Sequence, residues 1–254
     1  MANIEFCIPV YDGSFSYAVR NTGDAWPDLA TMTGGVVHPQ RTFSFPICDE
    51  VRINFNATTD QLVKLAYISG LSLDGLNFEV LAGSGLTSQL NVSQSVETIV
   101  RPKSRQLLEW SPVNTGEVEI IITGVNQRVL DIEQIIFCTE SFQPVRNFIG
   151  DQPARIGSIY NDLISRTSGR RKLNSKLRRF RFPLISLTES EIDVLDHTIT
   201  EKLNGGFCLI RLDPTNTSGK YNFLASIALD NGEATQYSGT DEQTIVNALE
   251  AYEQ

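Results

Sequence analysis

The segment from 166 to 211 constrains the fold most, because it joins a basic stretch, a capped helix and a short apolar run. Thr188 can accept a hydrogen bond from the amide of Glu191, and the Glu191 carboxylate can bond back, which is the pattern of a capping box. Apolar residues then recur at helical spacing until Gly205–Gly206, a pair typical of a helix C-terminus. We therefore predict a helix over about 188–204, packed on a sheet that its flanking strands supply.

The basic stretch is the sharpest anomaly of composition. Between 166 and 181 it carries eight Lys or Arg and no Asp or Glu, whereas the whole chain has a net charge of −9. A nucleic-acid surface and a solvated strand face are open interpretations. We favour a strand edge that docks on the acidic surface of a neighbouring subunit. The residues expected at this subunit interface are Arg166, Arg170, Arg171, Lys172, Lys176, Arg178, Arg179 and Arg181.

Residues 1–140 show many short stretches in which apolar and polar residues alternate, with turns between them. The alternation is clear in Val51–Phe55 and Val118–Thr123, and a break at Asn126–Gln127 separates the latter from the next strand. Short strands at near-regular spacing without a convincing helix are typical of a β-sandwich. We expect a sandwich of jelly-roll, galactose-binding-like type over 1–140.

The remainder of the chain divides into a junction and a second domain. Residues 141–157 hold two Pro and two Gly with little periodicity, so we predict a linker there. Residues 158–254 then form a small domain with one helix. Its last segment, 243–254, allows a helix or a closing strand, and we favour the strand.

Composition limits the classes of function. The sequence contains no run of eighteen apolar residues, which predicts no membrane span, and its first residues are not typical of a signal peptide. The pI near 4.8 argues against general affinity for nucleic acid or anionic membrane. The four cysteines lie in apolar, strand-like runs without the close spacing of zinc ligands, so we predict buried thiols in a protein made in a reducing cytoplasm.

Residues with catalytic potential do not gather in a motif. His38 and His197 lie near no nucleophile elbow, and no glycine-rich phosphate loop follows a strand. We therefore predict no enzyme activity, no cofactor and no metal. Tyr67, Trp110 and Tyr237 could form a sugar-stacking surface, although packing in the core or at its rim is the favoured interpretation. Trp26 is interpreted as a local core plug.

Several segments resemble structural proteins of the bacteriophage tail tip, distal tail and baseplate. The segment 107–137 (LLEWSPVNTGEVEIIITGVNQRVLDIEQIIF) looks like the closing half of their sandwich, and 142–148 (FQPVRNF) like its exit linker. The segments 183–199 (PLISLTESEIDVLDHTI) and 205–214 (GGFCLIRLDP) are similar to their tube-like split-barrel unit. Distal tail proteins usually place the tube-like domain first, whereas here the sandwich comes first.

The resemblance implies a mainly β chain, with the sandwich followed by a small α+β split barrel. It also implies a structural component of a phage tail tip or baseplate, synthesised in the host cytoplasm and located in the virion tail. The expected partners are copies of the chain in a ring, as a hexamer or trimer, together with the tail tube and hub proteins. The alternative function is a carbohydrate-binding adaptor module for host attachment.

Overall fold

The computed structural model is mainly β and divides into two compact units. It describes residues 4–10, 12–32, 43–71, 73, 75–93, 97–99, 103–143, 154–159, 162–165, 169–172, 177–184, 188–197, 207–215, 222–229, 234–237 and 243–253. The sandwich unit comprises Pro9–Ser141 and Asn216–Asn222. The C-terminal unit comprises Met1–Ile8, Phe142–Thr215 and Phe223–Gln254. Within the described ranges, no helix is long and apolar enough to cross a membrane.

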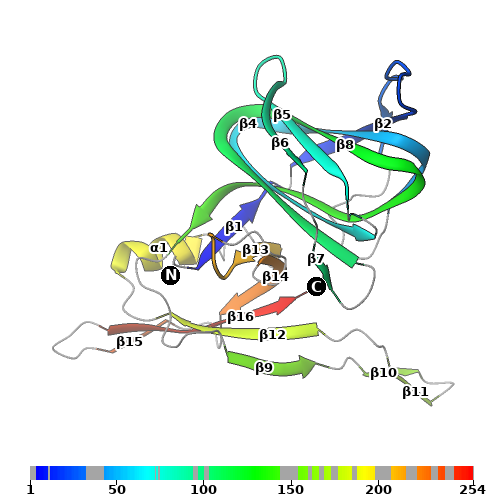
Figure 1. Ribbon diagram of the computed structural model, residues 1–254. Helices are drawn as coiled ribbons and strands as arrows, with labels where there is room; N and C mark the ends of the chain where they lie inside the picture. The colour runs from blue at the N-terminus through cyan, green and yellow to red at the C-terminus, as the bar shows by residue number, and fades with distance from the viewer. Residues whose placement is uncertain are drawn as a thin grey trace. The chain divides into compact units, whose positions relative to one another are not determined.

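Two long, bent strands build the sandwich unit (Figure 1). Its strands are β2 (Gly13–Arg20), β3 (Ala30–Thr31), β4 (Phe43–Leu71), β5 (Asn77–Ala82), β6 (Thr87–Ser93), β7 (Glu97–Ile99) and β8 (Lys103–Phe142). In a first layer, β4 residues 50–56 pair with β2 on one side and with β8 residues 117–123 on the other, followed by β5 and β6. In a second layer, β4 residues 65–71 lie between β8 residues 103–109 and 131–138.

Both long strands change layer at an irregularity of their pairing. In the pairing of β4 with β8, residues 57–60 of β4 lie opposite Gly116, and residues 124–127 of β8 lie opposite Asp49. The segment 124–127 of β8 contains Asn126 and Gln127, whose φ angles are 56° and 57°. These angles lie in the left-handed region that most residues avoid. The break predicted at Asn126–Gln127 is confirmed, but it bends one strand and does not separate two.

Alternation along the first layer determines which side chains fill the core. Val51, Ile53 and Phe55 are at most 2% exposed, and the residues between them point to the opposite face because successive strand residues alternate. The Phe55 ring stacks on Phe137 of the second layer with centroids 4.9 Å apart, which shows that the two layers share one core. The strand predicted over Val51–Phe55 is confirmed.

In its described residues, the C-terminal unit is an open series of strands with one helix. Its strands are β1 (Glu5–Pro9), β9 (Ala154–Ile159), β10 (Asp162–Ser165), β11 (Gly169–Lys172), β12 (Leu177–Leu184), β13 (Phe207–Arg211), β14 (Asn222–Leu229), β15 (Ala234–Tyr237) and β16 (Gln243–Glu253). They follow the order β1-β13-β14-β16-β12-β9, with β15 on β16 and β10 paired only with β11 among the described strands. The predicted closing strand is confirmed as β16, whereas the split barrel stays a prediction.

The helix α1 (Glu189–Asp196) begins as predicted. Thr188 Oγ1 accepts from the Glu191 amide at 3.2 Å, and Glu191 Oε2 accepts from the Thr188 amide at 2.8 Å. Residues 198–204, where we expected the helix to continue, lie outside the described residues. All four cysteines are buried thiols, as predicted.

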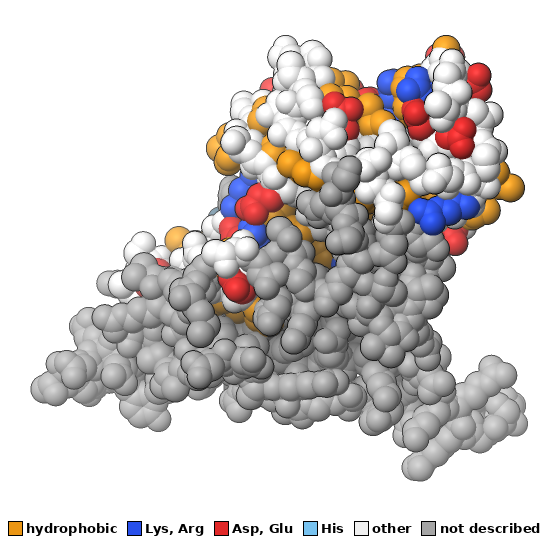
Figure 2. All heavy atoms as spheres, in the orientation of Figure 1, with side chains coloured by type: hydrophobic (Ala, Val, Ile, Leu, Met, Phe, Trp, Pro, Cys, Tyr) orange, Lys and Arg blue, Asp and Glu red, His pale blue; other side chains and the backbone are white. Residues whose placement is uncertain are grey.

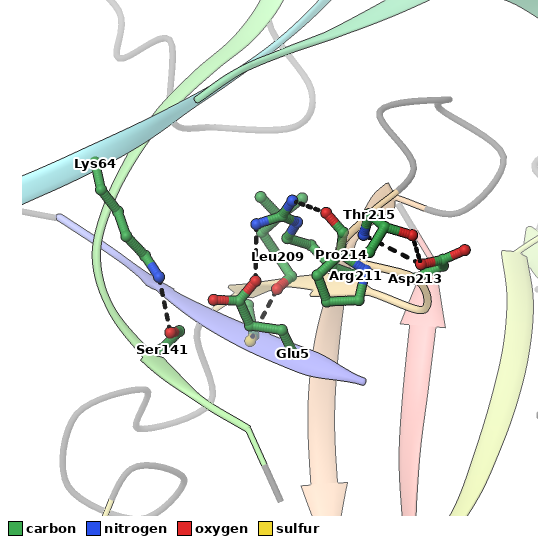
Figure 3. Close-up of polar contacts among 9 residues, drawn as sticks. Glu5, Lys64, Ser141, Leu209, Arg211, Asp213, Pro214 and Thr215 are labelled. Atoms are coloured by element: carbon green, nitrogen blue, oxygen red, sulfur yellow. Dashed lines mark hydrogen bonds and ion pairs between the residues drawn. The ribbon is translucent and has the colours of Figure 1, made fainter. Parts of the chain in front are cut away.

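The N-terminal strand β1 belongs to the C-terminal unit and not to the sandwich, where the sequence pattern places it. It pairs with β13, and this register sets Glu5 opposite Arg211. Arg211 is 1% exposed, donates from Nη1 to Glu5 Oε2 at 2.8 Å and from Nη2 to the Pro214 carbonyl at 2.6 Å (Figure 3). A long-range ion pair thus joins the two strands.

We predict that Arg211→Met lowers the free energy of unfolding by about 3 kcal/mol or more, because it removes one partner of a buried ion pair. Urea denaturation measures this loss. The matched control is Lys64→Met, which removes an exposed hydrogen bond of 2.9 Å to Ser141 (Figure 3) and should change stability by no more than about 0.5 kcal/mol. Equal losses in the two variants would contradict the importance of the Glu5–Arg211 pair.

Candidate functional site

The outer face of the first layer carries a connected set of polar side chains. Asn56 Nδ2 donates to Asn54 Oδ1 at 2.6 Å, and Asn54 Nδ2 donates to Glu117 Oε1 at 2.7 Å. Arg52 Nε lies 3.4 Å from Glu119 Oε1. These residues come from β4 and β8, at the positions that alternate with the buried core residues. The face is therefore built by the same alternation that fills the core.

Trp26 lies over this face from the connection that follows β2. Its ring centroid is 4.1 Å from the Arg20 guanidinium carbon and 4.5 Å from that of Arg52, and its side chain is half-buried. The register pairs Arg20 with Glu50 and Ala18 with Arg52, so both arginines rise from the same face. Arg20 Nε also donates to Glu50 Oε2 at 2.6 Å. We call Trp26, Arg20, Glu50, Arg52 and Glu119 the Trp26 site.

Polar contacts fix the connection that carries Trp26. The Thr22 amide donates to Asp49 Oδ2 at 2.9 Å, Gln127 Nε2 donates to Asn21 Oδ1 at 2.8 Å, and Arg20 Nη1 donates to the Asp24 carbonyl at 3.1 Å. Figure 2 shows charged side chains of both signs gathered around the loop at the end of β2. The indole is thus held on the two guanidinium groups by a loop with its own anchors.

Two carboxyl groups near the Trp26 site have shifted pKa values of opposite sign. Burial raises the pKa of Glu119 above the usual range, the Arg52 charge opposes this shift, and the Glu117 and Glu79 charges add to it. Hydrogen bonds, led by that from the Thr22 amide, lower the pKa of Asp49. Burial and the neighbouring carboxylates therefore disfavour the ionised form of the Glu119 carboxyl group.

The carboxylates of the outer face are held by partners. Glu50 is paired with Arg20, and Glu117 accepts a hydrogen bond from Asn54. An indole, guanidinium donors and carboxylate acceptors on one face can contact an apolar ring surface and its polar substituents together. Within the described ranges, no group of three or more His, Cys, Asp or Glu side chains could hold a metal ion.

The basic residues predicted at a subunit interface do not form one continuous strand. Arg170, Arg171 and Lys172 lie on β11, in a hairpin with β10. Arg178, Arg179 and Arg181 lie on β12, whereas Arg166 and Lys176 lie outside the described residues.

The prediction that the basic stretch forms a free strand edge is wrong for β12. This strand pairs with β16 on one side and β9 on the other, so its backbone groups already have partners within the sheet. An edge strand needs one unpaired side. Any contact made by Arg178, Arg179 or Arg181 with another chain would have to come from side chains.

The aromatic residues that the sequence singles out have other places. Tyr67 is 2% and Trp110 is 6% exposed, which confirms packing in the interior and excludes both as a stacking surface. The Tyr237 side chain lies outside the described residues.

Trp26 is not a core plug, because it packs on the outer face. Its partners come from β2 and β4, and only the strand register brings them together.

Comparison with known proteins assigns neither a family nor a function to this chain. No protein-family model and no curated protein sequence matches the chain. A chitosan-binding module from a Paenibacillus chitosanase/glucanase is 7% identical with a TM-score of 0.37, covering 52% of this chain and 98% of that chain. A family 32 carbohydrate-binding module from Clostridium perfringens in complex with galactose is 15% identical with a TM-score of 0.35, over the same shares. A Ruminococcus gnavus fucosidase is 10% identical with a TM-score of 0.36, covering 50% and 25%.

We predict that, as pH falls, the free energy of unfolding of the wild type rises relative to that of Glu119→Gln. The raised pKa means that the folded state binds a proton at Glu119 more tightly than the unfolded state does. This stabilisation is complete below the unfolded pKa and is lost as pH rises through the folded pKa. Urea denaturation from neutral to acidic pH measures it.

Asp49→Asn is a control for which we expect the opposite pH dependence of stability. The lowered pKa of Asp49 gives stability above the unfolded pKa that is lost as pH falls through the folded pKa. The difference between wild type and this variant should therefore shrink in acid. A difference for Glu119→Gln that stays constant with pH would contradict the shift assigned to Glu119.

Proposed function

We propose that the sandwich unit is a non-catalytic carbohydrate-binding module and that the Trp26 site receives the sugar. The observation that carries the proposal is a half-buried indole stacked on Arg20 and Arg52 beside carboxylates and amides held in fixed positions. A pyranose presents one apolar face and a rim of hydroxyl groups. Each hydroxyl both donates and accepts hydrogen bonds, so it fits a surface that offers an aromatic ring, donors and acceptors together.

Pre-organisation supports a binding role for this face. Trp26 has little freedom to lose on binding, because its loop is tied to Asp49 and Gln127 and its ring already contacts two guanidinium groups. A ligand that meets a site with ordered side chains avoids part of the entropic cost of association. Arg20 and Glu50 are ordered in the same way by their short ion pair.

We predict that Trp26→Ala reduces the affinity for a glycan bound by the full chain by about tenfold to a hundredfold. This range corresponds to about 1.5–3 kcal/mol for the burial of a large apolar side chain. A glycan array identifies the ligand, and isothermal titration calorimetry measures the loss. Ile47→Ala, which changes an exposed apolar residue of the same unit (63% exposed), should bind as the wild type does.

Binding that survives Trp26→Ala with unchanged affinity would remove the Trp26 site from the proposal. An array on which the wild-type chain binds no glycan would remove the carbohydrate-binding role altogether.

A second proposed function is assembly, as a structural component of a phage tail tip or baseplate. It is favoured by the hairpin β10–β11, which places Arg170, Arg171 and Lys172 in a row outside the main strand path of the described residues. A two-stranded hairpin is marginally stable by itself, so a covering surface would stabilise it. The chain outside 166–181 has a net charge of −17, from −9 in total and +8 in this segment. Another copy of the chain therefore offers an acidic surface, and a closed ring of copies is the expected assembly.

We predict that the triple change Arg170→Glu, Arg171→Glu and Lys172→Glu lowers the mass of any assembly formed by the chain at low salt, because it reverses the charge attracted to the acidic neighbour. Analytical ultracentrifugation measures the mass. The control is Lys64→Glu, a charge reversal in the sandwich unit. A wild-type chain that stays a monomer at every concentration, alone and with tail-tube proteins, would contradict the assembly role.

A further inference from the structure

The two arginines at the indole ring differ in how many of their hydrogen-bond donors are engaged. Each guanidinium nitrogen of Arg20 has a partner: Nε donates to Glu50 Oε2 at 2.6 Å, Nη2 lies 2.6 Å from the same oxygen, and Nη1 donates to the Asp24 carbonyl at 3.1 Å. Arg52 donates a hydrogen bond to no described residue, although its Nε lies 3.4 Å from Glu119 Oε1. Arg52 is therefore the arginine whose donors are open to a ligand.

The open donors of Arg52 reach the surface beside the indole. The Arg52 side chain is 26% exposed. Its Nε is buried, whereas Nη1 and Nη2 retain exposed surface, so the two nitrogens that carry four of its five N–H groups are accessible. The guanidinium carbon is 4.5 Å from the centroid of the Trp26 ring. A ligand that accepts from Nη1 and Nη2 therefore also lies next to the half-buried indole.

The formal charges of the Trp26 site cancel, which favours an uncharged partner for these donors. Arg20 is paired with Glu50, and Arg52 faces Glu119 at 3.4 Å, so two guanidinium groups meet two carboxylates. A ligand carboxylate would compete with Glu119 for the charge of Arg52, in a partly desolvated place where like charges repel more strongly than in bulk water. Two neighbouring hydroxyl groups accept hydrogen bonds from both ends of the planar fork without adding a charge.

We infer that Arg52 determines the specificity of the Trp26 site: it donates from Nη1 and Nη2 to two hydroxyl groups on adjacent carbons of an uncharged pyranose, so the site selects neutral sugars over uronic acids. The inference rests on the proposed carbohydrate-binding function. Arg20 has a different role, because its donors hold Glu50 and the loop that carries Trp26. Lysine cannot replace Arg52 in this role, since an ammonium group lacks the planar fork.

The first test varies only the charge of the sugar. The probes are the methyl glycosides of galactose, glucose and mannose, each beside the methyl glycoside of its own uronic acid, and NMR titration of the full chain measures their affinities. We expect the wild type to bind at least one neutral sugar, and to bind it at least tenfold more tightly than the matching uronic acid.

The second test removes the hydroxyl groups of the bound sugar one at a time, with its 2-, 3- and 4-deoxy forms. In the wild type, removal at two adjacent positions should each weaken binding by about tenfold or more, as expected for a hydrogen bond to a charged group. Arg52→Lys should bind the intact sugar about tenfold more weakly, and the same two removals should then cost at most about threefold, because the group that bound both hydroxyls is gone.

This comparison separates recognition by Arg52 from mere support of the indole. Loss of support alone would weaken the intact and the deoxy sugars by the same factor, and the cost of each removed hydroxyl would stay as in the wild type. Lys64→Met, which removes another cation of β4 from the same unit, is the control and should keep both the wild-type affinities and the wild-type pattern of deoxy sugars.

The remaining outcomes overturn the inference. Equal or tighter binding of the uronic acid would refute the selection of neutral sugars. Undiminished deoxy penalties in a folded Arg52→Lys chain would assign the hydroxyl groups to another residue. Binding of a glycan on the array without binding of any methyl glycoside would also refute the inference, and all three results leave the carbohydrate-binding role standing. A wild type that binds no sugar in the titration and no glycan on the array refutes both.

The wild-type chain alone decides if Arg52→Lys does not fold, which circular dichroism would show. The absence of the tenfold preference for the neutral sugar, or of two adjacent hydroxyl groups whose removal weakens binding, then overturns the inference.

Discussion

The structure of the sandwich unit depends on the antiparallel pairing of β4 with β8, which continues through both layers. The pairing fixes the register, and the register fixes the face on which each side chain lies. A slip by one residue would move Arg52 and Asn54 into the core and Ile53 out of it. The aromatic stack of Phe55 on Phe137 opposes such a slip. The register that the core packing fixes therefore also places the polar side chains on the outer face.

This dependence explains why the Trp26 site is both rigid and limited in its chemistry. Its arginines are set by two paired strands, and its tryptophan is set by a loop anchored at Asp49. The ion pairs and amide contacts hold donors and acceptors in place, which suits recognition of a polar ligand. The same contacts hold the Glu50 and Glu117 carboxylates against Arg20 and Asn54. The C-terminal unit contributes a different feature, the hairpin of β10 and β11, whose second strand has the sequence Gly-Arg-Arg-Lys.

Features encoded by neighbouring residues could be predicted from the sequence. The capping box at Thr188, the alternation in Val51–Phe55 and the break at Asn126–Gln127 each follow from a few consecutive residues. Features that depend on distant pairing could not. The pairing of β12 on both sides, the place of β1 beside β13 and the stack of Trp26 on Arg20 and Arg52 all require a register between remote segments. The candidate site belongs to this second group, because Arg20 and Glu50 lie 30 residues apart in the chain and Glu119 comes from a third strand, β8.

The fluorescence of Trp26 tests the central claim most directly. The chain has two tryptophans, and Trp110 is 6% exposed with an indole nitrogen that donates no hydrogen bond to a described residue. Trp110→Phe, which replaces a buried aromatic side chain by a smaller one, leaves Trp26 as the single reporter. If the Trp26 site receives the sugar, titration with the ligand found on the array will shift the emission to shorter wavelength and protect Trp26 from a soluble quencher, with the affinity that calorimetry gives. Binding detected by calorimetry with no change in Trp26 emission or quenching would place the ligand elsewhere and contradict the account.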